Sequence, residues 1–252
     1  MKEILEQVAN GELSVPEAEA QLQGYTISDA GRYDVARETR SGIPEAILGS
    51  GKSPSEVAEL VTSAVQTAGR AIVTRISDDQ YEMSINRLNS EYPDVDIDYH
   101  KRANILVVKS PSFETHHIDA TIGVISAGTG DIVPASEAAV IADEMGVTVE
   151  QIDDVGVASI ARILDQVDRL RQMDVVIVAA GREGSLPTIV AGMIDTPVIG
   201  LPVSTGYGHA GDGEAALKGM LQSCTVLSVV NIDAGFVAGA QAGLISQSIA
   251  DH

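Results

Sequence analysis

Hydrophobic positions in the second half of the chain fall into short runs, separated by glycine-bearing loops and helix-sized segments. Two of these runs, Val175–Ala180 and Pro197–Leu201, do not alternate with polar residues, which is typical of strands buried on both faces of a sheet. The segment between them has the length of a crossover helix, and such units bring their loops to the carboxyl ends of parallel strands. We therefore expect the loops 181–184 and 204–208 to lie side by side and to form the floor of a ligand site.

The same order of strands and helices continues over residues 120–252 and predicts a doubly wound parallel sheet. The further strands expected are Thr121–Ser126, Val149–Asp153 and Thr225–Asn231. The further helices expected are Pro134–Met145, Ala158–Met173, Asp212–Ser223 and Val237–Ala250. The last helix is rich in glycine and alanine, which suits close packing either between subunits or within one chain.

The preceding residues predict a smaller α/β domain with two short helices in front of it. Ser53, Pro54 and Glu56 form the capping box of a helix whose apolar positions run from Val57 to Ala68. Alternation over residues 35–39 favours a strand. The expected domains are a helical hairpin (1–30), a small α/β domain (31–115) and the doubly wound domain (116–252).

Composition narrows the possible functions. The 252 residues carry 36 acidic and 16 basic side chains, a formal charge of −20, which disfavours binding to nucleic acid or anionic membranes. Because Asp is abundant and few basic residues are lysines, the charge suggests adaptation to high salt; an ordinary acidic cytosolic enzyme is the alternative. A charged N-terminus and the absence of a long apolar run predict a cytoplasmic protein. The single cysteine, Cys224, excludes an internal disulfide.

Two glycine-bearing loops are candidates for ligand binding. Residues 127–131 (AGTGD) follow an expected strand and precede a helix, where backbone N–H groups can approach an anion. The alternatives are a simple strand-to-helix turn and a helix cap formed by Asp131. In the second loop, Arg182 could meet a phosphate and Glu183 could act as an acid or base. An exposed turn with a charge pair would give the same pattern.

Further candidates lie beside other expected strands, and Cys224 lies between an expected helix and the expected strand that begins near Thr225. Asp153 and Asp154 could hold a ribose or a metal, or could simply cap the next helix. Cys224 could be a small buried apolar residue or a nucleophile, and His209 could lower the pKa of a thiol. Asn231 and Asp233 end the last expected strand and are expected at the same edge of the sheet.

Together these segments resemble the pyridinium-3,5-biscarboxylic acid mononucleotide synthases, the LarB family, whose C-terminal domain is similar to the PurE-type aminoimidazole ribonucleotide carboxylases. The resemblance covers nearly the whole chain, although residues 209–213 (HAGDG) depart from the family pattern. It rests on residues 37–45 (RETRSGIPE), 127–131, 154–158, 181–187, 204–208, 223–224 and 230–233. The fold implied is a small α/β domain followed by a PurE-like doubly wound domain.

The resemblance implies carboxylation of nicotinic acid adenine dinucleotide with CO2 and cleavage of its phosphoanhydride, which releases AMP. The product begins the nickel-pincer nucleotide cofactor. The resemblance makes Cys224 the nucleophile, while Glu183 and His209 are our candidates for acid–base work. The substrate-binding residues we expect are Ser126, Gly128, Thr129, Gly130, Asp131, Asp154, Gly156, Gly181, Arg182, Gly184, Ser204, Gly206, Tyr207, Gly208, Asn231, Asp233, Arg37 and Arg40.

We expect a homo-oligomer, an octamer by analogy with PurE, with no tightly bound cofactor; a requirement for Mg²⁺ stays open. Two other functions fit the same residues. One is a PurE-like carboxylase or mutase acting on aminoimidazole ribonucleotide. The other is a non-enzymatic nucleotide-binding module, which should tolerate the loss of Cys224.

Overall fold

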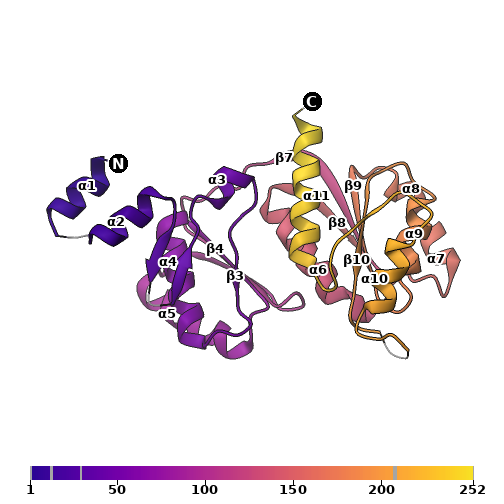
Figure 1. Cartoon of the computed structure of the whole chain (residues 1–252), viewed down its shortest axis with the longest axis horizontal. Helices are drawn as coiled ribbons and strands as arrows, with labels where there is room; N and C mark the ends of the chain where they lie inside the picture. The colour runs from indigo at the N-terminus through magenta and orange to yellow at the C-terminus, as the bar shows by residue number, and fades with distance from the viewer. Residues whose placement is uncertain (1, 12–13, 29, 207–208, 252) are drawn as a thin grey trace. The chain divides into compact units, whose positions relative to one another are not determined.

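The computed structural model describes residues 2–11, 14–28, 30–206 and 209–251. The chain divides into two compact units, Met1–Glu114 and Thr115–His252. Figure 1 shows each unit with its own sheet and helices. No helix within the described residues has the length and hydropathy needed to cross a membrane.

The first unit is built on a four-stranded sheet of order β3-β4-β6-β5, in which β3 and β4 are parallel and the other pairs antiparallel. Two long helices, α4 and α5, pack on this sheet and bury Val57, Val61 and Leu88. The elements are α1 (Lys2–Ala9), α2 (Val15–Leu22), β1 (Thr26–Ser28), β2 (Gly31–Tyr33), α3 (Arg37–Ser41), β3 (Ile47–Leu48), α4 (Pro54–Ala68), β4 (Arg70–Thr74), α5 (Asp78–Glu91), β5 (Asp96–His100) and β6 (Ile105–Lys109).

Of two local predictions for this unit, one is confirmed and the other is wrong. The capping box of α4 is present, because the side chains of Ser53 and Glu56 each accept a hydrogen bond from the other's backbone N–H. The strand expected over residues 35–39 is wrong, because this segment enters the short helix α3. Gly42 closes that helix at φ 70°, and its N–H donates to the carbonyl of Glu38. Arg37 and Arg40, which both lie in this helix, make ion pairs with Glu45 and Asp34.

The second unit contains a five-stranded parallel sheet of order β11-β10-β9-β7-β8, which confirms the expected fold class. Its elements are β7 (Ile118–Ser126), a 3₁₀ turn η1 (Thr129–Asp131), α6 (Ile132–Glu144), β8 (Val147–Ile152), α7 (Ile160–Leu164), α8 (Val167–Leu170), β9 (Val175–Ala180), α9 (Ser185–Ala191), β10 (Val198–Pro202), α10 (Glu214–Leu221), β11 (Ser228–Val229) and α11 (Gly235–Ala250).

Helices cover both faces of this sheet (Figure 1). Successive residues of β9 enter opposite cores: Val175 and Ile177 pack with α6 and α11, whereas Val176 packs with α7 to α10. This explains why the strand reads as an unbroken apolar run. The helix α11 contacts α6 so closely that a Cβ on Gly239 would lie 2.4 Å from the Ala138 carbonyl oxygen. At this position the glycine serves packing within the chain.

Two elements differ from the expected ones. The helix expected over residues 158–173 is divided into α7 and α8, each of which buries a single apolar side chain, Ile163 or Leu170. The last strand is reduced to the two residues of β11, which pairs only with β10 at the end of the sheet. The segment before β11 is bonded to α9, because the Thr225 hydroxyl donates a hydrogen bond to the Thr188 carbonyl at 3.3 Å.

Candidate functional site

A cavity of about 550 Å³ lies at the carboxyl ends of β7, β8, β9 and β10, the edge where open parallel sheets bind their ligands. Most of its lining residues are glycine, alanine or serine, so much of the wall is backbone and small side chains. Its charged lining residues are Asp131, Arg182 and Glu183. The remaining lining residues are Ala127, Gly128, Gly130, Gly156, Val157, Ala158, Ala180, Gly181, Ser185, Leu186 and Thr205.

Asp131 ties three of the loops around this cavity together. Its side chain is buried, and its two oxygens accept hydrogen bonds from the N–H of Gly128 at 2.9 Å and of Gly181 at 3.0 Å. The hydroxyl of Thr205 is 3.3 Å from the same carboxylate. Burial raises the pKa of Asp131, although these hydrogen bonds oppose the shift. Capping of the following helix therefore does not fully explain Asp131, because its side chain also joins the loops after β7, β9 and β10.

The backbone is strained where the strands end. Asp154, Arg182 and Asp233 follow β8, β9 and β11, and all three have positive φ, at 61°, 49° and 52°. A positive φ costs a residue other than glycine free energy, and such residues concentrate at functional sites. The strain therefore marks the same edge of the sheet as the cavity.

The loops are also joined by side chains outside the cavity wall. Asp233 accepts from the Ser204 N–H at 2.9 Å, which connects the loop after β11 to the loop after β10. The buried Ser126 hydroxyl donates to Asp153 at 2.7 Å, and Asp154 pairs with Arg162 at 3.1 Å. The carboxylates after β8 are thus engaged with neighbouring side chains. Within the described residues, no group of three His, Cys, Asp or Glu is arranged to hold a metal ion, and a requirement for Mg²⁺ stays a prediction.

Arg182 and Glu183 extend from the rim of the cavity toward solvent. Their side chains are 60% and 61% exposed, and the nearest nitrogen–oxygen distance between them is 3.9 Å, at the limit of an ion pair. The Ser185 hydroxyl donates to Glu183 at 2.8 Å and holds the carboxylate near the start of α9. An exposed arginine above backbone amides can receive the negative charge of a nucleotide.

Several expected site residues lie outside this cavity. Cys224 is exposed and comes before β11, whereas the cavity is formed by loops that follow strands. His209 and Asn231 are exposed and do not line the cavity; Asn231 accepts from the adjacent Ile232 N–H. Tyr207 and Gly208 lie outside the described residues.

Sequence reasoning missed Thr205, whose hydroxyl donates to the Gly130 carbonyl at 3.1 Å and also reaches Asp131. It also missed Ala158 and Leu186, which line the cavity. A threonine inside a glycine-rich loop is a weak signal of such a contact. The two apolar residues carry no sequence signal that separates them from ordinary helix residues.

Arg37 and Arg40 belong to the first unit, and both are paired there. Arg37 binds Glu45 at 2.8 Å, and Arg40 binds Asp34 at 2.6 Å. The hydrogen bond from Arg40 lowers the pKa of Asp34. These ion pairs give residues 37–45 (RETRSGIPE), together with the preceding Asp34, a structural role, because they hold the turn around α3 closed.

The same segment reaches a buried arginine. Glu38 pairs at 2.7 Å with Arg70, whose side chain is 4% exposed and whose guanidinium lies 4.7 Å above the ring of Phe113. The Tyr33 hydroxyl lies 3.4 Å from the Arg70 carbonyl, and burial raises its pKa. This cluster anchors α3 to β4.

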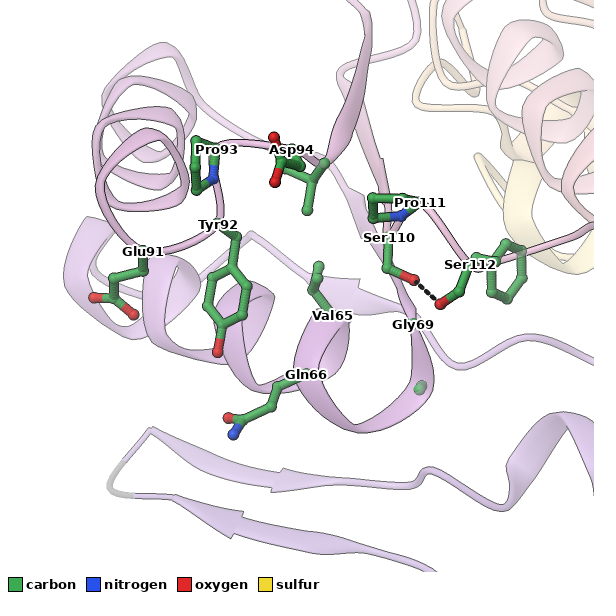
Figure 2. Close-up of a pocket in the computed structure, with 13 residues that line it drawn as sticks. Val65, Gln66, Gly69, Glu91, Tyr92, Pro93, Asp94, Ser110, Pro111 and Ser112 are labelled. Atoms are coloured by element: carbon green, nitrogen blue, oxygen red, sulfur yellow. Dashed lines mark hydrogen bonds between the residues drawn. The ribbon is translucent and has the colours of Figure 1, made fainter.

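A second cavity, of about 670 Å³, lies in the first unit where α4 and α5 end beside residues 110–113 (Figure 2). It is the larger of the two. Its charged lining residues, Glu91 and Asp94, are both acidic, and the helix ends there add negative potential. The cavity in the second unit has a basic side chain, Arg182, beside its acidic ones and lies at the carboxyl edge of a parallel sheet, so we place the candidate active site there.

The cavity in the second unit lies at the carboxyl edge of a parallel sheet, which is where α/β proteins of this architecture bind small molecules. Residues 25–110 match the LarB/PurE-like N-terminal domain, and residues 121–251 match AIR carboxylase. The chain is 37% identical to an uncharacterized protein of Methanocaldococcus jannaschii, over 98% of this chain and 97% of that protein. The chain therefore belongs to the LarB family and carries a PurE-like AIR carboxylase domain. The two domains indicate a carboxylase of the LarB/PurE type.

Proposed function

We propose that this protein carboxylates nicotinic acid adenine dinucleotide with CO2 and hydrolyses the phosphoanhydride, giving pyridinium-3,5-biscarboxylic acid mononucleotide and AMP. The observation that carries the proposal is the carboxyl-edge cavity, which combines glycine-loop amides with Arg182 and Glu183. A dinucleotide offers this site a pyrophosphate and a ring carboxylate, both anionic. The arginine supplies a charge-assisted contact to one of them.

The chemistry explains the need for a thiol. A pyridinium ring is electron-poor and does not attack CO2. In the proposed reaction, the Cys224 thiolate bonds to the ring carbon para to the nitrogen, and a π-electron pair moves onto that nitrogen. The enamine carbon meta to the nitrogen then attacks CO2 and forms the new carbon–carbon bond.

The later steps restore the ring. Glu183 is our candidate for the base that removes the proton from the carboxylated carbon, and the electron pair returns to the ring system. The carbon–sulfur bond then breaks, the thiolate leaves with its electron pair, and the pyridinium is aromatic again. In the hydrolytic step, water adds to one phosphorus of the pyrophosphate, and the P–O bond to the leaving AMP breaks.

The direct test is incubation of the protein with nicotinic acid adenine dinucleotide and ¹³C-bicarbonate, followed by mass analysis of the nucleotides. The expected products are a labelled biscarboxylated mononucleotide and unlabelled AMP. Neither product forming under conditions in which the protein is folded would overturn the proposal.

A second candidate function is carboxylation of aminoimidazole ribonucleotide, favoured by the match of residues 121–251 to AIR carboxylase. This reaction needs no thiol, because the aminoimidazole carbon is already nucleophilic. Turnover of that ribonucleotide that survives Cys224→Ser would support it. A non-enzymatic nucleotide-binding module would bind either nucleotide and convert neither.

A further inference from the structure

Ser126, the last residue of β7, holds the loop that follows β8 at two points. Its side chain is fully buried, and its hydroxyl donates to the Asp153 carboxylate at 2.7 Å. Its carbonyl accepts a hydrogen bond from the Val155 N–H at 3.1 Å. Gln151 donates to the same oxygen of Asp153 at 3.2 Å. Asp154 lies between the two bonded residues and has a φ of 61°, a conformation that persists only where neighbouring contacts fix it.

The rest of this loop is held against the end of β7 as closely as its first residues. Arg162 donates to the Asp154 carbonyl at 3.3 Å and to its carboxylate at 3.1 Å. Gly156 approaches the neighbouring loop so closely that a Cβ there would lie 2.5 Å from the Ala127 carbonyl oxygen. The loop after β8 therefore has little room to shift while these contacts are made.

This loop then forms one wall of the carboxyl-edge cavity. Gly156, Val157 and Ala158 line the cavity, whereas Ser126 and Asp153 are not among its described lining residues. We propose that Ser126 and Asp153 are a positioning pair, which sets the place of this wall and thereby the affinity for substrate without contacting the substrate. The inference rests on the proposed function, because its activity test uses the substrate proposed above. It replaces the ribose or metal contact considered for Asp153 with a bond inside the protein.

Steady-state kinetics with nicotinic acid adenine dinucleotide test the pair. Ser126→Ala and Asp153→Ala should each raise KM by about ten-fold, because each removes the same hydrogen bond. The value of kcat should stay within about two-fold of wild type, since the wall binds and does not react. The double variant should be no worse than either single variant. Losses that multiply, to about a hundred-fold, would show that the two residues act independently and would overturn the inference.

Asp153→Asn separates a positioning role from a ligand contact. An asparagine keeps an oxygen that can accept from the Ser126 hydroxyl but loses the negative charge, so its KM should stay within about three-fold of wild type. Asp119→Ala removes an exposed carboxylate at the opposite end of β7 and controls for the loss of charge alone. An Asn variant as impaired as Asp153→Ala would mean that the carboxylate itself contacts the substrate or a cation, which contradicts the inference.

Hydrogen–deuterium exchange tests the pair without substrate. In Ser126→Ala, backbone amides of residues 153–158 should exchange faster than in wild type, while those of the central strand β9 should be unchanged. Unchanged exchange in residues 153–158 would overturn the inference. Faster exchange there, in a protein that makes no product from the dinucleotide, would support the positioning pair and reject the proposed function.

Discussion

Two segments that combine arginine, glutamate and glycine, residues 34–45 in the first unit and 181–184 in the second, differ in where their charged side chains lie. In the first, Arg37 and Arg40 are paired with carboxylates of the same segment at 2.8 and 2.6 Å. In the second, Arg182 lies at the cavity rim, and its nearest ion-pair distance to Glu183 is 3.9 Å. The two arginine pairs of the first segment lie within a local turn, whereas the two charged side chains of the second segment line a cavity.

The contrast shows that an arginine in a motif is not by itself a sign of ligand binding. Compensating carboxylates close by in the sequence, such as Asp34 and Glu45, indicate a structural role. Arg182 differs in lining a cavity at the carboxyl edge of the sheet, where its backbone is also strained at φ 49°. The expectations below test this division of roles.

The largest effect is expected from Cys224→Ser. Serine is nearly isosteric but a far weaker nucleophile, so product formation from nicotinic acid adenine dinucleotide should be lost while folding is unchanged at this exposed position. Liquid chromatography with mass detection measures the product. Ser228→Ala, at an exposed position on β11, is the control and should retain most activity. Product from Cys224→Ser within a few-fold of wild type would rule out covalent catalysis.

Arg182→Gln and Arg40→Gln form a matched pair across the two segments. If Arg182 grips the ring carboxylate or the pyrophosphate, its loss should lower kcat/KM for the acid dinucleotide by about ten- to a hundred-fold, equivalent to about 1.5–3 kcal/mol. Arg40→Gln breaks an exposed pair, worth about 0–1 kcal/mol of stability, and should leave kcat/KM unchanged. Equal losses in both variants would contradict the division of roles.

Wild-type protein should also convert NAD poorly, because the neutral amide of NAD cannot replace the ring carboxylate of the acid dinucleotide.

Asp131→Asn should destabilise the loops around the cavity. An asparagine has one acceptor oxygen, whereas the two carboxylate oxygens of Asp131 accept from Gly128, Gly181 and Thr205. Leaving the buried Gly181 N–H without a partner should reduce the free energy of unfolding by about 1–3 kcal/mol. Denaturant titration measures this, with exposed Asp154→Asn as the control. Equal stability of the Asp131 variant and wild type would show that the loops keep their positions without the hydrogen bonds of the Asp131 carboxylate.

The pH dependence of that difference follows from the raised pKa of Asp131. A carboxyl whose pKa is higher in the folded state contributes most stability below its ordinary value of 3.8, and loses this contribution as pH rises through the folded pKa. The stability advantage of wild type over Asp131→Asn should therefore narrow from acidic toward neutral pH. A widening difference over that range would mean that the hydrogen bonds, not burial, dominate the pKa.

The smallest effect is expected from salt. A formal charge of −20 favours expansion at low ionic strength, so Tm should rise between dilute buffer and molar KCl. Differential scanning calorimetry measures this change. A flat or falling Tm would argue against adaptation to high salt and leave the site unaffected.

The parallel sheet could be predicted because its central strands are buried on both faces, so that Val175–Ala180 is apolar throughout. The loops at its carboxyl edge followed from the same pattern. The bonds of Asp131 to Gly181 and Thr205 could not be predicted, because they join residues 50 and 74 positions apart. The α3 helix was missed because the alternation of Val35, Arg37 and Thr39 was interpreted as a strand, whereas the segment enters a short helix closed by Gly42.

The position of Cys224 shows a different limit. The sequence already predicted Cys224 between a helix and the last strand, but only the structure shows which residues line the cavity, and Cys224 is not among them.

Hydrogen–deuterium exchange on Cys224→Ser, with and without nicotinic acid adenine dinucleotide, tests the division between the two segments most directly, because this variant should bind without turnover. The account predicts that the dinucleotide slows exchange of backbone amides in residues 127–131, 153–158 and 181–186 and leaves residues 34–45 unchanged. Protection confined to residues 34–45, or to the cavity beside residues 110–113, would contradict it.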